Sequence, residues 1–360
     1  MTNKDKKNNV ETSISRRAFV SSMATLAAAS GMSAQSVFAA QKSLPMAVSA
    51  INHMTLAVSD PTASLAWYQG LFGLPIVARQ GGTVVLQVGD GPQFIALGGN
   101  ASDNPRITHY CLAVDNFDHS KAVQILAENG VDAANASAVM QSRVRMRGEE
   151  FGGAVNGTPE LYFGDPDGIV VQLQDSSYCG GAGLLGEDCL LTAEPAATNG
   201  LLSIREFNHF TLFVSDQSRS IQFYQSLFGM PIDTYQGALP VLRIGNGKQF
   251  LALSNQPTLT SQIHHASIAV EDFDVDRIFS LLESYGLTIL GEARGANGPL
   301  QAYVTLRGEN RGGAAEGTPE LYFTDPDGIL IQLQDVSYCG GNGYLGNECG
   351  SVGKPTGRNN

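Results

Sequence analysis

Apolar and polar residues alternate in several short stretches of the chain, which is typical of β-strands with one buried face. Residues 53–60 (HMTLAVSD) show this alternation, and residues 64–73 (SLAWYQGLFG) then place large apolar residues on one helix face. We expect Gly73 to end that helix, because a proline two residues later cannot continue it. Short β-rich runs follow at 83–89 and 93–99, so the segment predicts the element order βαβββ.

The chain repeats this order four times. Residues 107–175 run again from strand to helix to strands, and the whole pattern then recurs in the second half of the chain. Residues 51–76 match 207–232 at an offset of 156, and residues 157–181 match 317–341 at an offset of 160. This tandem duplication predicts domains at 48–189 and 204–349, a linker at 190–203 and a tail at 350–360.

Composition narrows the classes of function. The 360 residues suffice for two domains with cores of their own, and the formal net charge is −12. Nucleic-acid binders usually carry a basic face, so we expect no nucleic-acid partner. No apolar run reaches the roughly 18 residues that a membrane-spanning helix needs, so we expect no membrane span in the mature chain.

Residues 1–40 look like a twin-arginine signal peptide. Lysines open the segment, Arg16 and Arg17 precede an Ala-rich run, and the small residues before Ala40 suit a signal peptidase. An amphipathic helix with a chance arginine pair is the alternative. We therefore expect the twin-arginine machinery to export the protein to the periplasm, and removal of the segment would change the net charge from −12 to −15.

Three features together resemble the vicinal oxygen chelate superfamily, which includes glyoxalase I, the fosfomycin and bleomycin resistance proteins and the extradiol dioxygenases. They are the paired βαβββ modules, the motif FYxxLFGxP after the first strand, and LYFxDPDGxxxQLQD near the end of each half. The resemblance covers nearly all of residues 48–340 and implies an α+β fold of two domains, each with a curled mixed sheet. Four modules in one chain is the arrangement of the extradiol dioxygenases.

The resemblance also implies a divalent metal ion, either Fe, Mn or Zn, in each domain. The positions that match the family's ligands are His53, His109 and Gln172 in the first half, and His209, His265 and Gln332 in the second. Strand alternation puts each histidine on a face with small residues, which leaves room for an ion and a substrate. The family's usual third ligand is Glu, so Gln here would leave every protein ligand neutral.

Two other interpretations of these residues remain open. Another carboxylate, such as Glu149 or Glu309, could complete the metal site, or the histidines could only form hydrogen bonds in the core. The extradiol signature also has a histidine upstream of LYxxDP, which both halves lack. Strict alternation predicts that His264 points away from the face of His265.

Further residues outside the ligand set carry chemistry. Arg147 and Arg307 recur in RGE motifs and could bind an acidic substrate, although a strand-end ion pair is the simpler interpretation. In an exported protein, two cysteines on either side of a Gly-rich turn are typical of a disulfide, and here the candidate pairs are Cys179 with Cys189 and Cys339 with Cys349. Cys111 is then a free thiol, in core packing or as a ligand or nucleophile.

The sequence therefore predicts an exported, metal-dependent enzyme that acts on a small molecule with two adjacent oxygens. A ring-cleaving dioxygenase is the leading subclass. A metal-free periplasmic binding protein of the bleomycin-resistance type and a metal-dependent isomerase or lyase are the alternatives. A homo-oligomer is compatible with the sequence.

Overall fold

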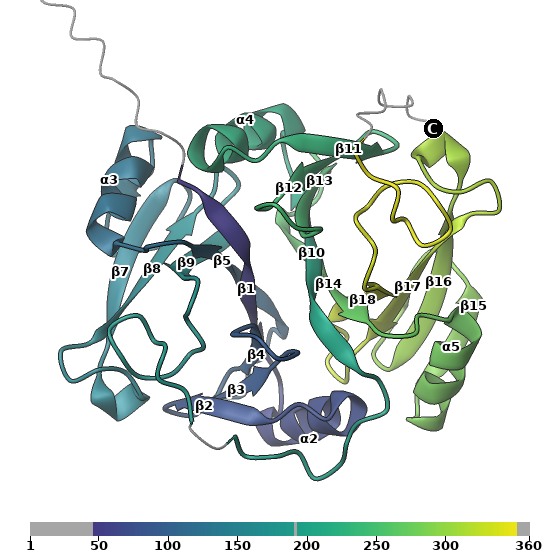
Figure 1. Cartoon of the computed structure of the whole chain (residues 1–360), viewed down its shortest axis with the longest axis horizontal. Helices are drawn as coiled ribbons and strands as arrows, with labels where there is room; N and C mark the ends of the chain where they lie inside the picture. The colour runs from purple at the N-terminus through teal and green to yellow at the C-terminus, as the bar shows by residue number, and fades with distance from the viewer. Residues whose placement is uncertain (1–45, 191–192, 351–360) are drawn as a thin grey trace, which may run out of the picture. The chain divides into compact units, whose positions relative to one another are not determined.

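The computed structural model describes residues 46–190 and 193–350. These residues contain two nine-stranded mixed sheets, one built from each half of the chain. In Figure 1 the first sheet runs from purple to teal and the second from green to yellow. The fold is therefore α+β, as the sequence predicted.

The first domain contains two modules whose strands form one sheet in the order β2-β3-β4-β1-β5-β9-β8-β7-β6. Its elements are β1 (Val48–Ala57), α2 (Pro61–Phe72), β2 (Ile76–Gln80), β3 (Thr83–Gln87), β4 (Phe94–Leu97), β5 (Arg106–Val114), α3 (His119–Glu128), β6 (Asp132–Ala133), β7 (Gln141–Arg147), the 3₁₀ turn η1 (Glu149–Phe151), β8 (Thr158–Gly164) and β9 (Val170–Asp175). The first strands of the two modules, β1 and β5, are antiparallel neighbours at the centre of the sheet.

The second domain repeats this topology in the order β11-β12-β13-β10-β14-β18-β17-β16-β15. Its elements are β10 (Ile204–Val214), α4 (Gln217–Phe228), β11 (Ile232–Gln236), β12 (Leu239–Arg243), β13 (Phe250–Asn255), β14 (Gln262–Val270), α5 (Val275–Ser284), β15 (Thr288–Glu292), β16 (Gln301–Arg307), η2 (Glu309–Arg311), β17 (Thr318–Thr324) and β18 (Leu330–Asp335). The predicted βαβββ order holds in the first and third modules. The second and fourth modules add a strand, β6 or β15, at the sheet edge.

Local sequence signals explain where the first helix begins and ends. The Asp60 side chain accepts hydrogen bonds from the backbone N–H groups of Thr62 and Ala63, which caps the N-terminus of α2. Gly73 has a φ of 67° and closes the C-terminus, as predicted, because a residue with a Cβ atom avoids this left-handed conformation.

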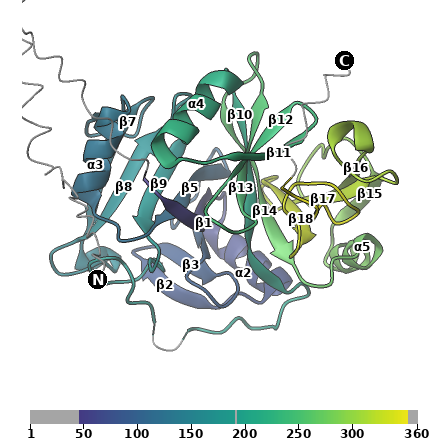
Figure 2. The same ribbon diagram turned by 45° about the horizontal axis from the view of Figure 1, so that its top comes forward.

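One face of each sheet packs in a hydrophobic core that both domains share. Met54, Leu56 and Val58 lie in this core, so the predicted alternation of the first strand is confirmed. The helices α3 and α5 lie beside the outer strands of their own sheets (Figures 1 and 2). The helix α2 also contacts the other domain, where the Trp67 ring lies 5.8 Å from that of Phe323.

Both predicted cysteine pairs are disulfide-bonded. The bonds join Cys179 to Cys189 and Cys339 to Cys349, each across ten positions of sequence, and Cys111 is free and buried. The predicted signal segment at 1–40 lies outside the described residues. Among the helices that the structure describes, none is long and apolar enough to cross a membrane.

Candidate metal centres

The predicted ligands lie on the polar face of each sheet, opposite the shared core. We call the residues around His53, His109 and Gln172 cup 1, and those around His209, His265 and Gln332 cup 2. Strand register places six residues of cup 1 side by side across six strands: Phe94, His53, Cys111, Gln172, Tyr162 and Arg143. The equivalent row in cup 2 is Phe250, His209, Ser267, Gln332, Tyr322 and Tyr303.

A β-bulge precedes each of the two histidines predicted as ligands in cup 1. The register between β1 and β5 shifts between Ile51 and His53, and again around Thr108. A bulge re-aims a side chain that strict alternation would send to the other face. Consequently Asn52 and Thr108 lie beside the histidines that follow them, where Asn52 Oδ1 is 2.7 Å from His53 Nδ1 and Thr108 Oγ1 is 3.1 Å from His109 Nδ1.

The first of these contacts determines the tautomer of His53. Asn52 Nδ2 donates to the Tyr178 carbonyl at 2.8 Å, so Oδ1 accepts the proton of His53 Nδ1. Thr108 Oγ1 lies 3.1 Å from both the Thr55 carbonyl and His109 Nδ1, and when its single proton goes to the carbonyl it accepts from His109 Nδ1. In that arrangement both Nε2 atoms present lone pairs to the interior of cup 1.

Gln172 completes a convergence of three acceptors. Its Oε1 lies 3.0 Å from His53 Nε2 and 3.0 Å from His109 Nε2, whereas its buried Nε2 has no hydrogen-bond partner among the described residues. Two ligand atoms bound at right angles, each about 2.1 Å from a shared ion, are about 3.0 Å apart. The residues of cup 1 therefore fit a divalent cation, with two neutral imidazoles and one amide oxygen as ligands.

Cup 2 reproduces the first half of this arrangement. Asn208 Nδ2 donates to the Tyr338 carbonyl at 2.8 Å, and Asn208 Oδ1 lies 2.8 Å from His209 Nδ1, so His209 also presents an Nε2 lone pair. His265 Nε2 is buried, with no partner among the residues that the structure describes. This buried, unpartnered nitrogen beside His209 fits a set of candidate metal ligands like that of cup 1.

His264 differs from its predicted position. It occupies the bulge equivalent to Thr108, and its Nδ1 lies 2.8 Å from Nδ1 of His265. Its ring stacks on Phe213 at 4.1 Å. The prediction that His264 points to the opposite face is wrong, because the bulge interrupts the two-residue alternation.

Burial keeps the cup histidines neutral. It lowers the pKa of His109 to about 4 and that of His209 to about 3, and it lowers the pKa values of His53 and His265 well below their usual value. A neutral imidazole is the form that binds a metal ion, so no proton has to leave at neutral pH before binding.

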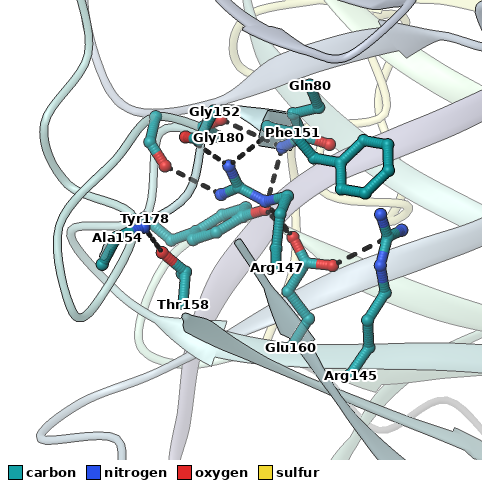
Figure 3. Close-up of polar contacts among 12 residues, drawn as sticks. Gln80, Arg145, Arg147, Phe151, Gly152, Ala154, Thr158, Glu160, Tyr178 and Gly180 are labelled. Carbon is teal, nitrogen blue, oxygen red and sulfur yellow. Dashed lines mark hydrogen bonds and ion pairs between the residues drawn. The ribbon is translucent and has the colours of Figure 1, made fainter. Parts of the chain in front are cut away.

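A buried carboxylate beside each cup was not predicted from the sequence. Glu160 Oε1 accepts from Arg147 Nε at 2.6 Å and from the Tyr178 hydroxyl at 3.0 Å (Figure 3). Its Oε2 accepts from the Tyr162 hydroxyl at 3.1 Å. Tyr162 pairs with Gln172 in the strand register, and Glu160 lies two residues before Tyr162, on the same face of the strand. This spacing was the signal in the sequence that could have identified Glu160. Glu320 occupies the equivalent place in cup 2. By contrast, Glu149 and Glu309 are exposed in η1 and η2 and do not complete the metal sites.

Arg147 and Arg307 have structural contacts rather than an accessible guanidinium. Both are buried, at 0% and 1% exposure. Besides its ion pair with Glu160, Arg147 donates to the carbonyl of Gly152 (Figure 3). It also donates to the carbonyl of Gly181, and the two bonds join η1 and the disulfide loop to the sheet. The expectation that these arginines bind substrate does not agree with this burial, because every side of the group is already used.

A cleft of about 700 Å³ adjoins cup 2. His264, Tyr303, Glu320 and Tyr322 line it, and the Tyr322 ring lies 5.4 Å from that of His265. The cleft therefore lies next to the predicted ligands, with room for a small molecule.

Comparison with known protein families identifies the family of the chain. The model of the Glyoxalase/Bleomycin resistance protein/Dioxygenase superfamily matches residues 50–173 and 206–333, so the chain belongs to this superfamily. No curated protein sequence matches the chain.

Solved structures resemble the chain in fold. A catechol 2,3-dioxygenase is 15% identical, with a TM-score of 0.52, and the match covers 80% of this chain and 88% of that one. The Mn(II)-bound glyoxalase from Novosphingobium aromaticivorans is 18% identical, with a TM-score of 0.52 and coverages of 80% and 82%. The 2,3-dioxygenase LapB from Pseudomonas sp. KL28 is 15% identical, with a TM-score of 0.54 and coverages of 80% and 92%.

Proposed function

We propose that the protein is an exported enzyme that binds a divalent metal ion in each cup and acts on a small substrate with two adjacent oxygens. The observation that carries this proposal is the convergence of two Nε2 lone pairs and Gln172 Oε1 in cup 1. The ion, when bound, would act as a Lewis acid toward the two substrate oxygens. Ring-cleaving dioxygenation is the subclass we favour, and its support is the four-module architecture shared with the dioxygenase structures.

The chain's own residues would hold and orient such a substrate. Tyr162 and Tyr322 lie next to the glutamine ligands in the strand register, and each directs its hydroxyl toward a buried glutamate. These tyrosines are thereby fixed as walls of the cups. In cup 2 the adjoining cleft supplies the space for the remainder of the substrate.

Because the candidate ligands are all uncharged, we can state how strongly each cup should bind a metal ion. Because no carboxylate compensates the charge of the ion, binding to the empty cup should be weak, and it should strengthen when an anionic chelator such as a catecholate enters. The arrangement that competes with an ion is a reversed Gln172 amide, whose Nε2 donates to both imidazoles. A metal-free binding protein would have this second arrangement.

Metal analysis of protein purified from its native host tests the proposal. We expect up to one ion per cup, loss of the cup 1 ion in His109→Ala and loss of the cup 2 ion in His265→Ala. His119→Ala is the matched control, since His119 lies at the start of α3, outside both cups. Oxygen consumption with catechol then separates dioxygenation from isomerase or lyase chemistry. Metal-free protein that also shows no binding heat with a metal and catechol would refute the enzyme and favour the binding protein.

A further inference from the structure

The two cups differ at only two positions of the row described above. Cys111 in cup 1 corresponds to Ser267 in cup 2, and Arg143 corresponds to Tyr303. The first exchange replaces one small buried residue by another. The second places a cation in one cup and an aromatic ring in the other, at the same distance from the metal ligands in the strand register.

Arg143 is a cation that has no counter-ion in the part of the chain that the structure describes. Its guanidinium carbon lies 5.3 Å from the centre of the Tyr162 ring, whose plane in turn lies edge-on to His109 at 5.3 Å. Arg143 is exposed, and among the described residues it takes part in no ion pair. The other two arginines on this face of β7 are already engaged, because Arg145 lies 3.9 Å from Glu160 Oε2 and Arg147 is bound to Oε1.

The spacing of the strands gives the distance between the backbones of Arg143 and Gln172. Its strand is the second from that of Gln172, and neighbouring strands are about 4.8 Å apart, so the two backbones are separated by roughly 10 Å. One aromatic ring can bridge such a span if it has chelating oxygens at one end and a carboxylate at the other. A guanidinium binds a carboxylate with two parallel hydrogen bonds, which also orients the ring.

In cup 2 the position of Arg143 is occupied by the aromatic ring of Tyr303. Its ring stacks on Tyr322 with centroids 5.0 Å apart and an interplanar angle of 14°. The cleft also contains Arg294 and Arg311, but Glu292 and Glu320 line it as well. Because Glu320 is already paired with Arg307, the cleft keeps positive charge of its own, and the difference from cup 1 lies at the register position of Arg143, where cup 2 has a flat aromatic surface in place of a cation.

We propose that Arg143 makes cup 1 selective for an aromatic substrate that carries a carboxylate beside the ring, whereas cup 2, with Tyr303 at the equivalent position, lacks this preference. This inference rests on the proposed function, because it assumes that both cups hold a metal ion. It assigns the two halves of the duplicated chain to different members of one substrate class.

Calorimetric titration of the full chain in the presence of Zn²⁺ tests this inference. His265→Ala leaves cup 1 as the metal-bound cup, and His109→Ala leaves cup 2. The probes are catechol and 3,4-dihydroxybenzoate, which differ only in the carboxylate. We expect the cup 1 protein to bind dihydroxybenzoate about tenfold more tightly than catechol, with a preference that weakens as NaCl is added.

Substitutions in the same backgrounds locate the effect. Arg143→Gln and Arg143→Tyr should abolish the preference in cup 1, Arg143→Lys should retain part of it, and Tyr303→Arg should create it in cup 2. Lys121→Gln, which removes one positive charge from the exposed surface of α3, is the control and should change nothing. An unchanged preference in Arg143→Gln, or equal affinities for both probes in cup 1, would overturn the inference while metal binding and the proposed function stand. Wild-type protein that is purified without metal and also shows no binding heat with a metal and catechol would instead refute the proposed function.

Discussion

The hydroxyl of Tyr68 donates a hydrogen bond of 2.9 Å to Oδ2 of Asp325, which lies 257 positions later in the sequence. The reciprocal bond, also 2.9 Å, runs from Tyr224 to Asp165. Each tyrosine belongs to the first helix of one domain, and each aspartate is the first residue of the DPDG motif of the other. The duplication has therefore produced two equivalent bonds between the domains, both buried.

Removal of either hydroxyl should destabilise the protein. Tyr68→Phe or Tyr224→Phe leaves a buried carboxylate oxygen without this donor, which costs about 1–3 kcal/mol. Urea unfolding monitored by circular dichroism measures the loss. Tyr344→Phe, at a half-exposed tyrosine, is the control and should leave the free energy of unfolding unchanged. If all three variants are equally stable, the interdomain bonds contribute nothing.

The same aspartates predict a pH dependence of stability. Burial raises the pKa values of Asp165 and Asp325 to about 6, above those of an unfolded chain. The folded state therefore holds these protons more tightly, and the stabilisation from them is lost as the pH rises from about 4 to about 6. The loss amounts to at most about 2–3 kcal/mol for each carboxyl. In Asp165→Asn/Asp325→Asn, urea unfolding between pH 4 and pH 8 should show a smaller decline than in the wild type, and an identical decline would contradict the prediction.

Asn52 should control metal binding without touching the ion. Because it fixes the tautomer of His53, Asn52→Ala should weaken the metal affinity of cup 1 by about 10- to 100-fold. Competition with a chromophoric chelator measures the two sites, and the Asn208→Ala variant should weaken cup 2 alone. Equal effects of Asn52→Ala on both cups would show that it acts through general destabilisation.

Gln172→Glu should raise the affinity of cup 1 for a divalent ion by at least about tenfold, because a carboxylate adds a negative charge to the ligand set. A carboxylate also lacks the N–H groups with which the reversed amide would satisfy both imidazoles. Gln172→Leu should abolish the site. Equal metal affinities of the Glu and Leu variants, measured by calorimetry, would exclude residue 172 as a ligand.

Export should depend on the arginine pair at the start of the chain. We predict that Arg16→Lys/Arg17→Lys leaves the precursor in the cytoplasm, and that wild-type protein from the periplasm begins near Ala40. Cell fractionation and N-terminal sequencing measure both. Unchanged export of the double variant would contradict a twin-arginine signal.

Periodicity in the sequence predicted most of the fold, whereas the candidate ligand set came from the family resemblance. The alternation around His53 placed this histidine opposite Met54 and Leu56, and the structure buries both of these in the core. Duplicated motifs predicted the two domains, and the match to the family's motif made Gln172 and Gln332 the candidate third ligands. The edge strands β6 and β15 were not predicted, because β6 has two residues and β15 is only partly buried, so neither shows a clear alternation of apolar and polar residues.

The sequence by itself determined the repeated modules, the faces of the central strands and the cysteine pairs, because these follow from local periodicity and spacing. Only the tertiary structure decided how the site is built. A bulge breaks the period on which alternation depends, so the positions of Asn52, Thr108 and His264 beside the ligand histidines could not be derived from that period. The ion pair of Arg147 with Glu160 and the unpaired Arg143 depend on the register of β7 against β8, which distant parts of the chain set together.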